Sequence, residues 1–241
     1  MNLQKIPGFE TTAYAYQGGR IVWAGVDGAT DHPRNALKPW EPGAQPLQVN
    51  ITDLQAGAAI CLALFGPAET HPLQARGLIN WLLGQALDFP LNRAVGRFDA
   101  VRNGLNRHDL AAFTAASLKV LGLGHGLTPS GDDFVGGVMF TLHHLRASVS
   151  DLSWLDGLPP AARQLQQAAQ TQTNVISAAL LDDLMTGRSY RALHDLLAAL
   201  NTRDAVTIET ATARLLALGA SSGADMLAGV LLAIGTLRSH H

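Results

Sequence analysis

Residues 121–140 read LGLGHGLTPSGDDFVGGVMF, and they join a glycine-rich loop to an apolar run of helical period. Ser130 and Asp133 are spaced as in a capping box, in which each side chain bonds the backbone N–H of the other at a helix start. A cap requires neither the six glycines of this stretch nor a second aspartate at Asp132. We therefore expect residues 124–133 to start a helix and also to bind a ligand.

The C-terminal part of the chain repeats this pattern. TPSGDDFVGGVMF begins at Thr128 and ASSGADMLAGVLL begins at Ala220, an offset of 92 residues. The positions that match are Ser130, Gly131, Asp133, Gly137 and Val138 with Ser222, Gly223, Asp225, Gly229 and Val230. Because a helix N-terminus carries a partial positive charge, two such starts that converge would form a pocket suited to an anion.

The residue types in the two copies indicate chemical roles. Glycines ahead of a helix bring backbone N–H groups close to an anion, and hydroxyl side chains add hydrogen bonds. The residues expected to bind substrate or phosphate are Gly124, Gly126, Thr128, Ser130, Gly131, Ser222, Gly223 and Asp225. The expected catalytic residues are Asp132 and Asp133, which would orient a substrate nitrogen, transfer a proton or hold Mg²⁺ beside a substrate phosphate.

A dedicated protein metal site is not predicted, because the nine histidines show no His-x-x-x-His spacing and the chain has one cysteine. That cysteine, Cys61, lies among aliphatic residues and is expected to be a buried, inert thiol. The glycine-rich stretch is also not a Walker phosphate loop, since no Gly-Lys-Ser/Thr follows it, nor a dinucleotide fingerprint, since no strand precedes it.

Composition narrows the class of partner. The net charge is -2 with no basic block, so nucleic acid is not an expected partner. No apolar run approaches the ~20 residues of a membrane span, and MNLQKIPGFETT has no signal core, so we expect a cytoplasmic protein with no membrane contact. Charged residues make up only 15% of the chain, which favours contact surfaces in a homo-oligomer or with companion subunits.

The predicted fold class is α+β, with a small sheet or barrel-like unit over residues 1–66. TTAYAYQGGRIVWAGVD contains two β-rich runs joined by Gly18 and Gly19, which is typical of a hairpin. Two further short strands are predicted in residues 46–54 and 58–65. The unit is expected to end near Gly66.

Residues 67–241 are predicted to form an all-helical domain of about eight helices, because the apolar period becomes helical there. One helix is expected over residues 71–89, and the last is expected to end near Leu237. In the helix that contains TNVIS, residues 173, 174 and 177 would bond either a small polar ligand or a neighbouring helix. Asp182 and Asp183, near the end of that helix, are expected to be solvated.

The segment GLGHGLTPSGDDFVGG closely resembles the signature of the AllH-like family, long classed as a domain of unknown function. TNVISAALLDDLMTG (173–187) and GASSGADMLAGVLLA (219–233) resemble the same family. One type of member is the small subunit of oxamate carbamoyltransferase, from anaerobic allantoin degradation. The resemblance implies a transferase subunit that works with companions on a small amide and carbamoyl phosphate. His125 stands where proline is more usual, so it is not expected to be essential.

Two alternatives stay open at this point. The chain would be a non-catalytic ligand-binding or scaffolding subunit if its partners supplied the chemistry. A small-molecule kinase is the third hypothesis, because SGDDFVGG is similar to the GAGDxFxGG stretch of ribokinase-like sugar kinases. The alternation of strands and helices that such kinases need is missing around the stretch.

Overall fold

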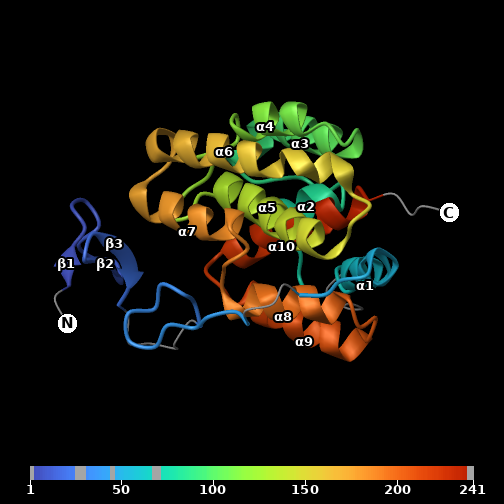
Figure 1. Cartoon of the computed structure of the whole chain (residues 1–241), viewed down its shortest axis with the longest axis horizontal. Coiled ribbons are helices and arrows are strands. Elements are labelled where there is room, and N and C mark those ends of the chain that lie inside the picture. The colour runs from blue at the N-terminus through green and yellow to red at the C-terminus, as the bar shows by residue number, and fades with distance from the viewer. Residues whose placement is uncertain (1–2, 25–30, 44–46, 67–71, 238–241) are drawn as a thin grey trace.

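The computed structural model describes residues 3–24, 31–43, 47–66 and 72–237. Its architecture is α+β, as predicted: a three-stranded antiparallel sheet is followed by a body of helices (Figure 1). The strands are β1 (Gln4–Lys5), β2 (Tyr14–Gln17) and β3 (Arg20–Trp23), in the order β1-β2-β3.

The hairpin prediction is confirmed. β2 and β3 pair through Gln17 and Arg20, and Gly18 and Gly19 form the turn between them. Both glycines have positive φ, 57° and 78°, as the central residues of a hairpin turn of the primed kind require. Strand β1 was not predicted, because two residues are too few to show an alternating pattern.

The sheet is fixed to the helical body by an apolar cluster and a buried ion pair. We call the described residues from 3 to 43, which carry the three strands, the sheet segment. Its residues Ile6 and Ile21 pack with Ile176 and Leu180 of α7 (Val175–Met185). Below the sheet, the Arg34 guanidinium donates two hydrogen bonds to the Asp183 carboxylate, Nε to Oδ2 at 2.5 Å and Nη2 to Oδ1 at 3.0 Å.

The expectation that Asp183 is solvated was therefore wrong, because it is buried and paired with Arg34. Its neighbour Asp182 is exposed and accepts a hydrogen bond from Gln166, at 2.6 Å. The two carboxylates differ because they lie on different faces of α7. The sequence of one helix does not reveal which of its faces will be covered by a distant segment.

The two strands predicted in residues 46–54 and 58–65 are also wrong. One helix, α1 (Ile51–Ala63), occupies that region, and Asn50 caps its start by accepting from the Asp53 N–H at 3.1 Å. A short apolar run fits either a strand or a buried helix segment, and here the Asn cap decides for the helix. α1 packs on α8, α9 and α10. The division of the chain into domains at residue 66 stays a prediction.

The helix predicted over residues 71–89 is much shorter, and residue 71 lies outside the described residues. α2 spans only Leu78–Leu82. Before it, Leu73 pairs with Phe65, and Gly77 has a positive φ of 53°, which interrupts any helix. The Leu78 N–H donates to the Asp225 carboxylate at 2.8 Å, so the start of α2 is set by a distant residue.

The remaining helices follow the apolar periods of the sequence. They are α3 (Val95–Asn106), α4 (Leu110–Ser117), α5 (Ser130–Ser148), α6 (Leu158–Gln172), α8 (Arg191–Leu200), α9 (Ala205–Leu216) and α10 (Ser222–Gly235), with 3₁₀ turns at Leu91–Arg93 and Ser153–Gly157. No helix among the described residues is long and apolar enough to cross a membrane.

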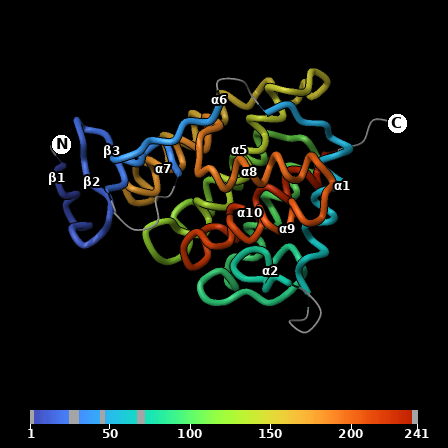
Figure 2. Tube along the Cα trace, turned by 90° about the horizontal axis from the view of Figure 1, so that it is seen from below, coloured from blue at the N-terminus to red at the C-terminus, as the bar shows by residue number. Residues whose placement is uncertain are grey.

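Helices α5 and α10, the two that begin with the repeated motif, form the centre of the body. α3, α4 and α6 lie on one side of them and α8, α9 and α1 on the other (Figures 1 and 2). A Cβ on Gly137 would stand 2.2 Å from the Met226 carbonyl oxygen, and one on Gly229 would stand 2.2 Å from that of Phe134. The glycines shared by the two copies therefore let the two helices cross backbone to backbone.

Candidate functional site

The starts of α5 and α10 are built alike and lie against each other. The second residue of each helix is a glycine packed on a backbone carbonyl: a Cβ on Gly131 would meet the Val120 oxygen at 1.8 Å, and one on Gly223 the Leu215 oxygen at 1.9 Å. Their N–H groups donate to the Leu123 and Leu218 carbonyls. Gly131 and Gly223 are thus packing residues here, with their N–H groups already engaged.

The loops that lead into the two helices differ in length. Gly124 and Gly219 correspond, and both have positive φ, 124° and 59°. Ser130 follows Gly124 by six residues, whereas Ser222 follows Gly219 by three. Within the described residues, the N–H groups of Ser130 and Ser222 have no acceptor, and neither do those of Gly124 and Gly126. Free donors therefore remain at both helix starts.

The capping boxes expected within each helix are absent. The N-cap residues are Pro129 and Ser221, and neither makes a side-chain cap hydrogen bond. Each serine instead acts on the aspartate of the other copy: Ser222 lowers the pKa of the Asp133 carboxyl of α5, and Ser130 lowers that of the Asp225 carboxyl of α10. The repeat thus links the two helices to each other rather than capping each one separately.

Asp133 is a buried acid with an unused oxygen. It is 6% exposed, and its Oδ2 has no hydrogen-bond partner among the described residues. Burial raises the pKa of Asp133 well above its ordinary value, and the nearby Asp225 carboxyl raises it further, while Ser222 and Thr128 lower it by hydrogen bonding. The neutral carboxyl is therefore favoured, and it has both a proton to donate and a free acceptor.

Asp225 is the corresponding acid of α10 and is completely buried. Its Oδ1 accepts from the Leu78 N–H, and its Oδ2 has no partner among the described residues. Burial raises its pKa to about 6, against the opposing effects of the Leu78, Ser130 and Ser221 hydrogen bonds and of Arg76. The two acids of the repeat are thus perturbed in the same direction for the same reason.

Asp132 holds the loop in place. Its Oδ1 accepts from the Gly122 N–H at 2.7 Å, and its Oδ2 accepts from the hydroxyls of Thr173 at 2.5 Å and Ser177 at 2.7 Å. Burial raises its pKa in spite of these bonds. For Thr173 and Ser177, the structure therefore favours helix packing over ligand binding. Asn174 caps α7 and donates to the Leu127 carbonyl.

The donor set does not fit magnesium. Both oxygens of Asp132 accept hydrogen bonds, and the burial of Asp133 favours a proton over a cation. The described residues contain no group of three or more His, Cys, Asp or Glu that is able to hold a metal ion. No chemical step is therefore assigned to a metal.

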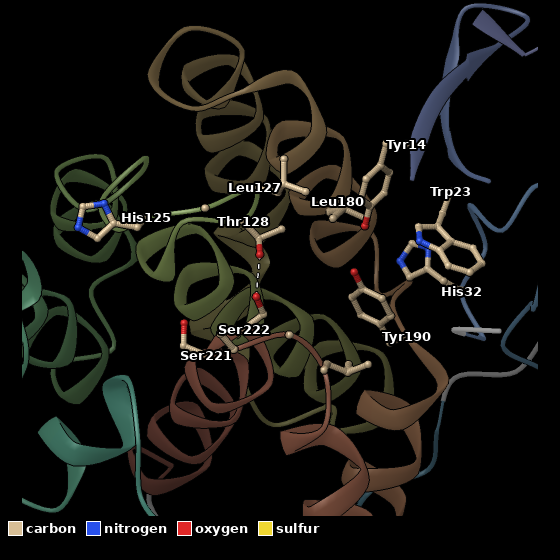
Figure 3. A pocket seen from close by; sticks show the side chains of 14 residues that line it. Tyr14, Trp23, His32, His125, Leu127, Thr128, Leu180, Tyr190, Ser221 and Ser222 are labelled. Carbon is tan, nitrogen blue, oxygen red and sulfur yellow. Dashed lines mark hydrogen bonds between the residues drawn. The ribbon is translucent and has the colours of Figure 1, made fainter. Parts of the chain in front are cut away.

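A cavity of about 340 Å³ opens beside the two helix starts (Figure 3). At its centre the hydroxyls of Thr128 and Ser222 are hydrogen-bonded at 2.7 Å. Tyr14, Trp23 and His32 of the sheet segment and Tyr190, the residue before α8, supply its opposite wall. The Tyr14 and Tyr190 hydroxyls point toward each other. We call this space the aromatic cavity.

The aromatic wall was missed by sequence reasoning. Tyr14, His32 and Tyr190 stand far apart in the chain, and no local motif surrounds any of them. The His32 ring packs on the Tyr190 ring with centroids 4.5 Å apart, and its Nδ1 accepts from the Arg34 N–H. Burial lowers the His32 pKa to about 3, so the ring is neutral and Nε2 carries its proton.

A second cavity, of about 480 Å³, lies on the other side of the loops, and we call it the Arg76 cavity. Gly124, Ser130 and Ser221 line it from the helix starts, and Arg76 supplies a cation. His125 lies on this side of the loop, away from Thr128, and lines both cavities (Figure 3).

Cys61 and a group of histidines lie outside these two cavities. Cys61 is buried as expected, and burial raises its pKa to about 11, so it is an unreactive thiol. His143 and His144 lie near the other end of α5, where they line a third cavity of about 480 Å³ together with His194.

Residues 120–234 match the protein-family model described as oxamate carbamoyltransferase subunit AllH. The resemblance to the AllH family that the sequence indicated is confirmed over this segment. Both helix starts and Tyr190 lie inside the matched segment, whereas Tyr14, His32 and the whole sheet lie outside it. No curated protein and no solved structure shows a significant match to the chain.

Proposed function

We propose that this chain is a subunit of a carbamoyltransferase-type enzyme, acting on an oxamate-like amide and carbamoyl phosphate. The observation that carries the proposal is Asp133, a buried acid whose Oδ2 has no partner among the described residues and whose pKa is influenced by Thr128 and Ser222, the hydroxyl pair of the aromatic cavity. Buried, perturbed acids beside a cavity are typical of functional sites.

In the forward reaction the amide nitrogen forms a bond to the carbamoyl carbon. The bond from that carbon to the phosphate oxygen breaks, phosphate leaves with the electron pair, and the nitrogen loses one proton. Free N–H groups at Ser130 and Ser222, reinforced by the helix dipoles, would bind the anionic groups of the substrates. The neutral Asp133 carboxyl would donate a hydrogen bond to a substrate oxygen, and Asp132 would position the loop.

The family description is that of a subunit, and we extend this to the present chain. We propose that companion subunits, or further copies of the chain, complete the enzyme. A non-catalytic ligand-binding role is the second candidate. It is favoured by the aromatic cavity itself, because the lining residues that the structure describes include no Lys, Arg, Asp or Glu side chain.

The test is phosphate release from carbamoyl phosphate in the presence of oxamate, with the chain alone and with the companion subunits that purify with it. Asp133→Asn keeps the shape of the side chain, and we expect it to lower turnover of the assembled enzyme about a hundredfold or more. The matched control is Asp182→Asn, which changes an exposed aspartate and is expected to have no effect.

Unchanged turnover in Asp133→Asn would overturn the catalytic assignment. Binding of oxamate without turnover in the assembled enzyme would support the ligand-binding role instead. Circular dichroism and urea unfolding of each variant establish that a loss of activity does not come from a loss of structure.

A further inference from the structure

The aromatic cavity differs from the Arg76 cavity in charge. The aromatic cavity is lined by hydroxyl, imidazole, indole, aliphatic and backbone groups, with no Lys, Arg, Asp or Glu among its described lining residues. The Arg76 cavity has both Arg76 and Asp88 in its wall. Two spaces beside the same pair of helix starts therefore offer different environments to a ligand.

The titratable groups of the aromatic wall are held in their neutral forms. Burial raises the pKa of Tyr14 and of Tyr190, and the Asp133 carboxyl raises both further. His32 is neutral and has a proton on Nε2, because its Nδ1 accepts from the Arg34 N–H. The two tyrosines thus present hydroxyl groups that both donate and accept, and His32 presents an N–H donor.

A primary amide matches this set of groups better than a carboxylate does. An amide has one accepting oxygen and two N–H donors and carries no charge, whereas a carboxylate only accepts and must lose its hydration shell. Among the described residues that line the cavity there is no cation to compensate for that loss. The volume of about 340 Å³ is that of a small ligand site.

The wall is held in place by the buried ion pair between the sheet segment and α7. Arg34 bonds Asp183 through two nitrogens and the Ile21 carbonyl through a third, at 3.1 Å. Because Arg34 is also the residue whose N–H orients the His32 ring, the ion pair sets the position of His32 against Tyr190.

We infer that the aromatic cavity is a subsite for an uncharged amide group, and that Tyr14, His32 and Tyr190 select this group over a carboxylate. Arg34 is a positioning residue for this selection. The inference rests on the proposed function for the choice of an oxamate-like substrate. It adds that the sheet segment, outside the residues matched by the family model, determines which end of that substrate is recognised.

The experiment is calorimetric titration of the full chain, alone and in the assembled enzyme, with oxamate, oxalate and oxamide. Oxamate and oxalate differ only in that an amide replaces one carboxylate, and oxamide has two amides. We expect oxamate to bind at least tenfold more tightly than oxalate. We expect a double variant, Tyr14→Phe with Tyr190→Phe, to reduce this preference to threefold or less.

The matched control is Tyr16→Phe, which removes a hydroxyl from the same strand but outside the aromatic cavity, and which should keep the full preference. Oxalate binding as tightly as oxamate would overturn the inference, and so would a preserved preference in the double variant. Absence of binding of all three compounds, in both forms of the protein, would also overturn it.

The readout needs no turnover, so the two proposals fail separately. Selective binding of oxamate without carbamoyl transfer would remove the proposed function and leave the amide subsite. Carbamoyl transfer without any preference for the amide would support the proposed function and overturn the amide subsite.

Discussion

In both α5 and α10 the second residue is a glycine packed on a carbonyl oxygen, and the fourth is an aspartate with one oxygen that has no partner within the described part of the chain. The third residue differs: it is Asp132 in α5 and Ala224 in α10. Asp132 holds a loop that is three residues longer than its counterpart and that supplies Thr128 to the aromatic cavity. The shared residues thus build the helix crossing, and the residues of one copy alone shape the cavity.

The largest expected effect is on the close crossing of α5 and α10, which depends on glycines that both copies of the repeat share. In Gly229→Ala the new Cβ would stand 2.2 Å from the Phe134 carbonyl oxygen, so α5 and α10 must move apart. We expect a loss of about 3 kcal/mol or more in the free energy of unfolding, measured with urea. Gly235→Ala, in the last turn of the same helix, meets nothing within 4 Å and should be neutral or slightly stabilising. Equal effects of the two substitutions would contradict the close crossing.

The next prediction tests the residue that only α5 has. Asp132→Ala removes the carboxylate that accepts three hydrogen bonds. The Gly122 N–H and the hydroxyls of Thr173 and Ser177 then lose this acceptor. We expect the free energy of unfolding to fall by about 3 kcal/mol. The exposed Asp182→Ala is the control and should change it by less than about 0.5 kcal/mol. A small effect at Asp132 would mean that the long loop is held by other contacts.

The pH dependence of stability tests the buried acid of α10. The pKa of Asp225 rises on folding from 3.8 to about 6, so between these values the folded protein binds more protons than the unfolded chain. Stability from this group is therefore complete below about pH 4 and is lost as the pH rises through 6, by about 3 kcal/mol.

Asp225→Asn cannot ionise and should lose this dependence. The difference in unfolding free energy between the variant and the natural protein should then shift in favour of the variant by about 3 kcal/mol between pH 4 and pH 7. The pKa of Asp133 is raised as well, so Asp133→Asn should shift in the same direction. A difference that is constant with pH would show that neither acid is perturbed.

The smallest expected effect concerns the link between the long loop and α10. Thr128→Val removes the 2.7 Å hydrogen bond to Ser222 while keeping the size of the side chain. We expect a loss of about 1 kcal/mol in unfolding free energy. Thr210→Val on the exposed face of α9 serves as the control, because its hydroxyl bonds only a carbonyl of its own helix. If Thr210→Val lowered the unfolding free energy more than Thr128→Val does, the Thr128–Ser222 hydrogen bond would contribute little to stability.

Much of the architecture was predictable from local sequence. The Gly18-Gly19 hairpin, the helical character of residues 95–235 and the two helix starts follow from turn chemistry and apolar period. Residues 46–54 and 58–65 were predicted to be two strands, since a short apolar run without period fits both a strand and a buried helix segment. The late start of α2 at Leu78 was not predictable, because it depends on Asp225, which is distant in sequence.

The candidate site was predictable only in part. Repetition along the chain indicated Ser130, Asp133, Ser222 and Asp225, but the local capping interpretation hid the fact that each serine influences the aspartate of the other helix. The aromatic wall gave no signal, because it is assembled from three distant segments.

The central claim is that the paired starts of α5 and α10 form one ligand-binding site. The most direct measurement is a crystal structure of the protein soaked with oxamate and carbamoyl phosphate. We predict density for a ligand within hydrogen-bond distance of Thr128 and Ser222, in contact with the aromatic cavity. Density at the cavity of His143, His144 and His194, with none at the two helix starts, would contradict it.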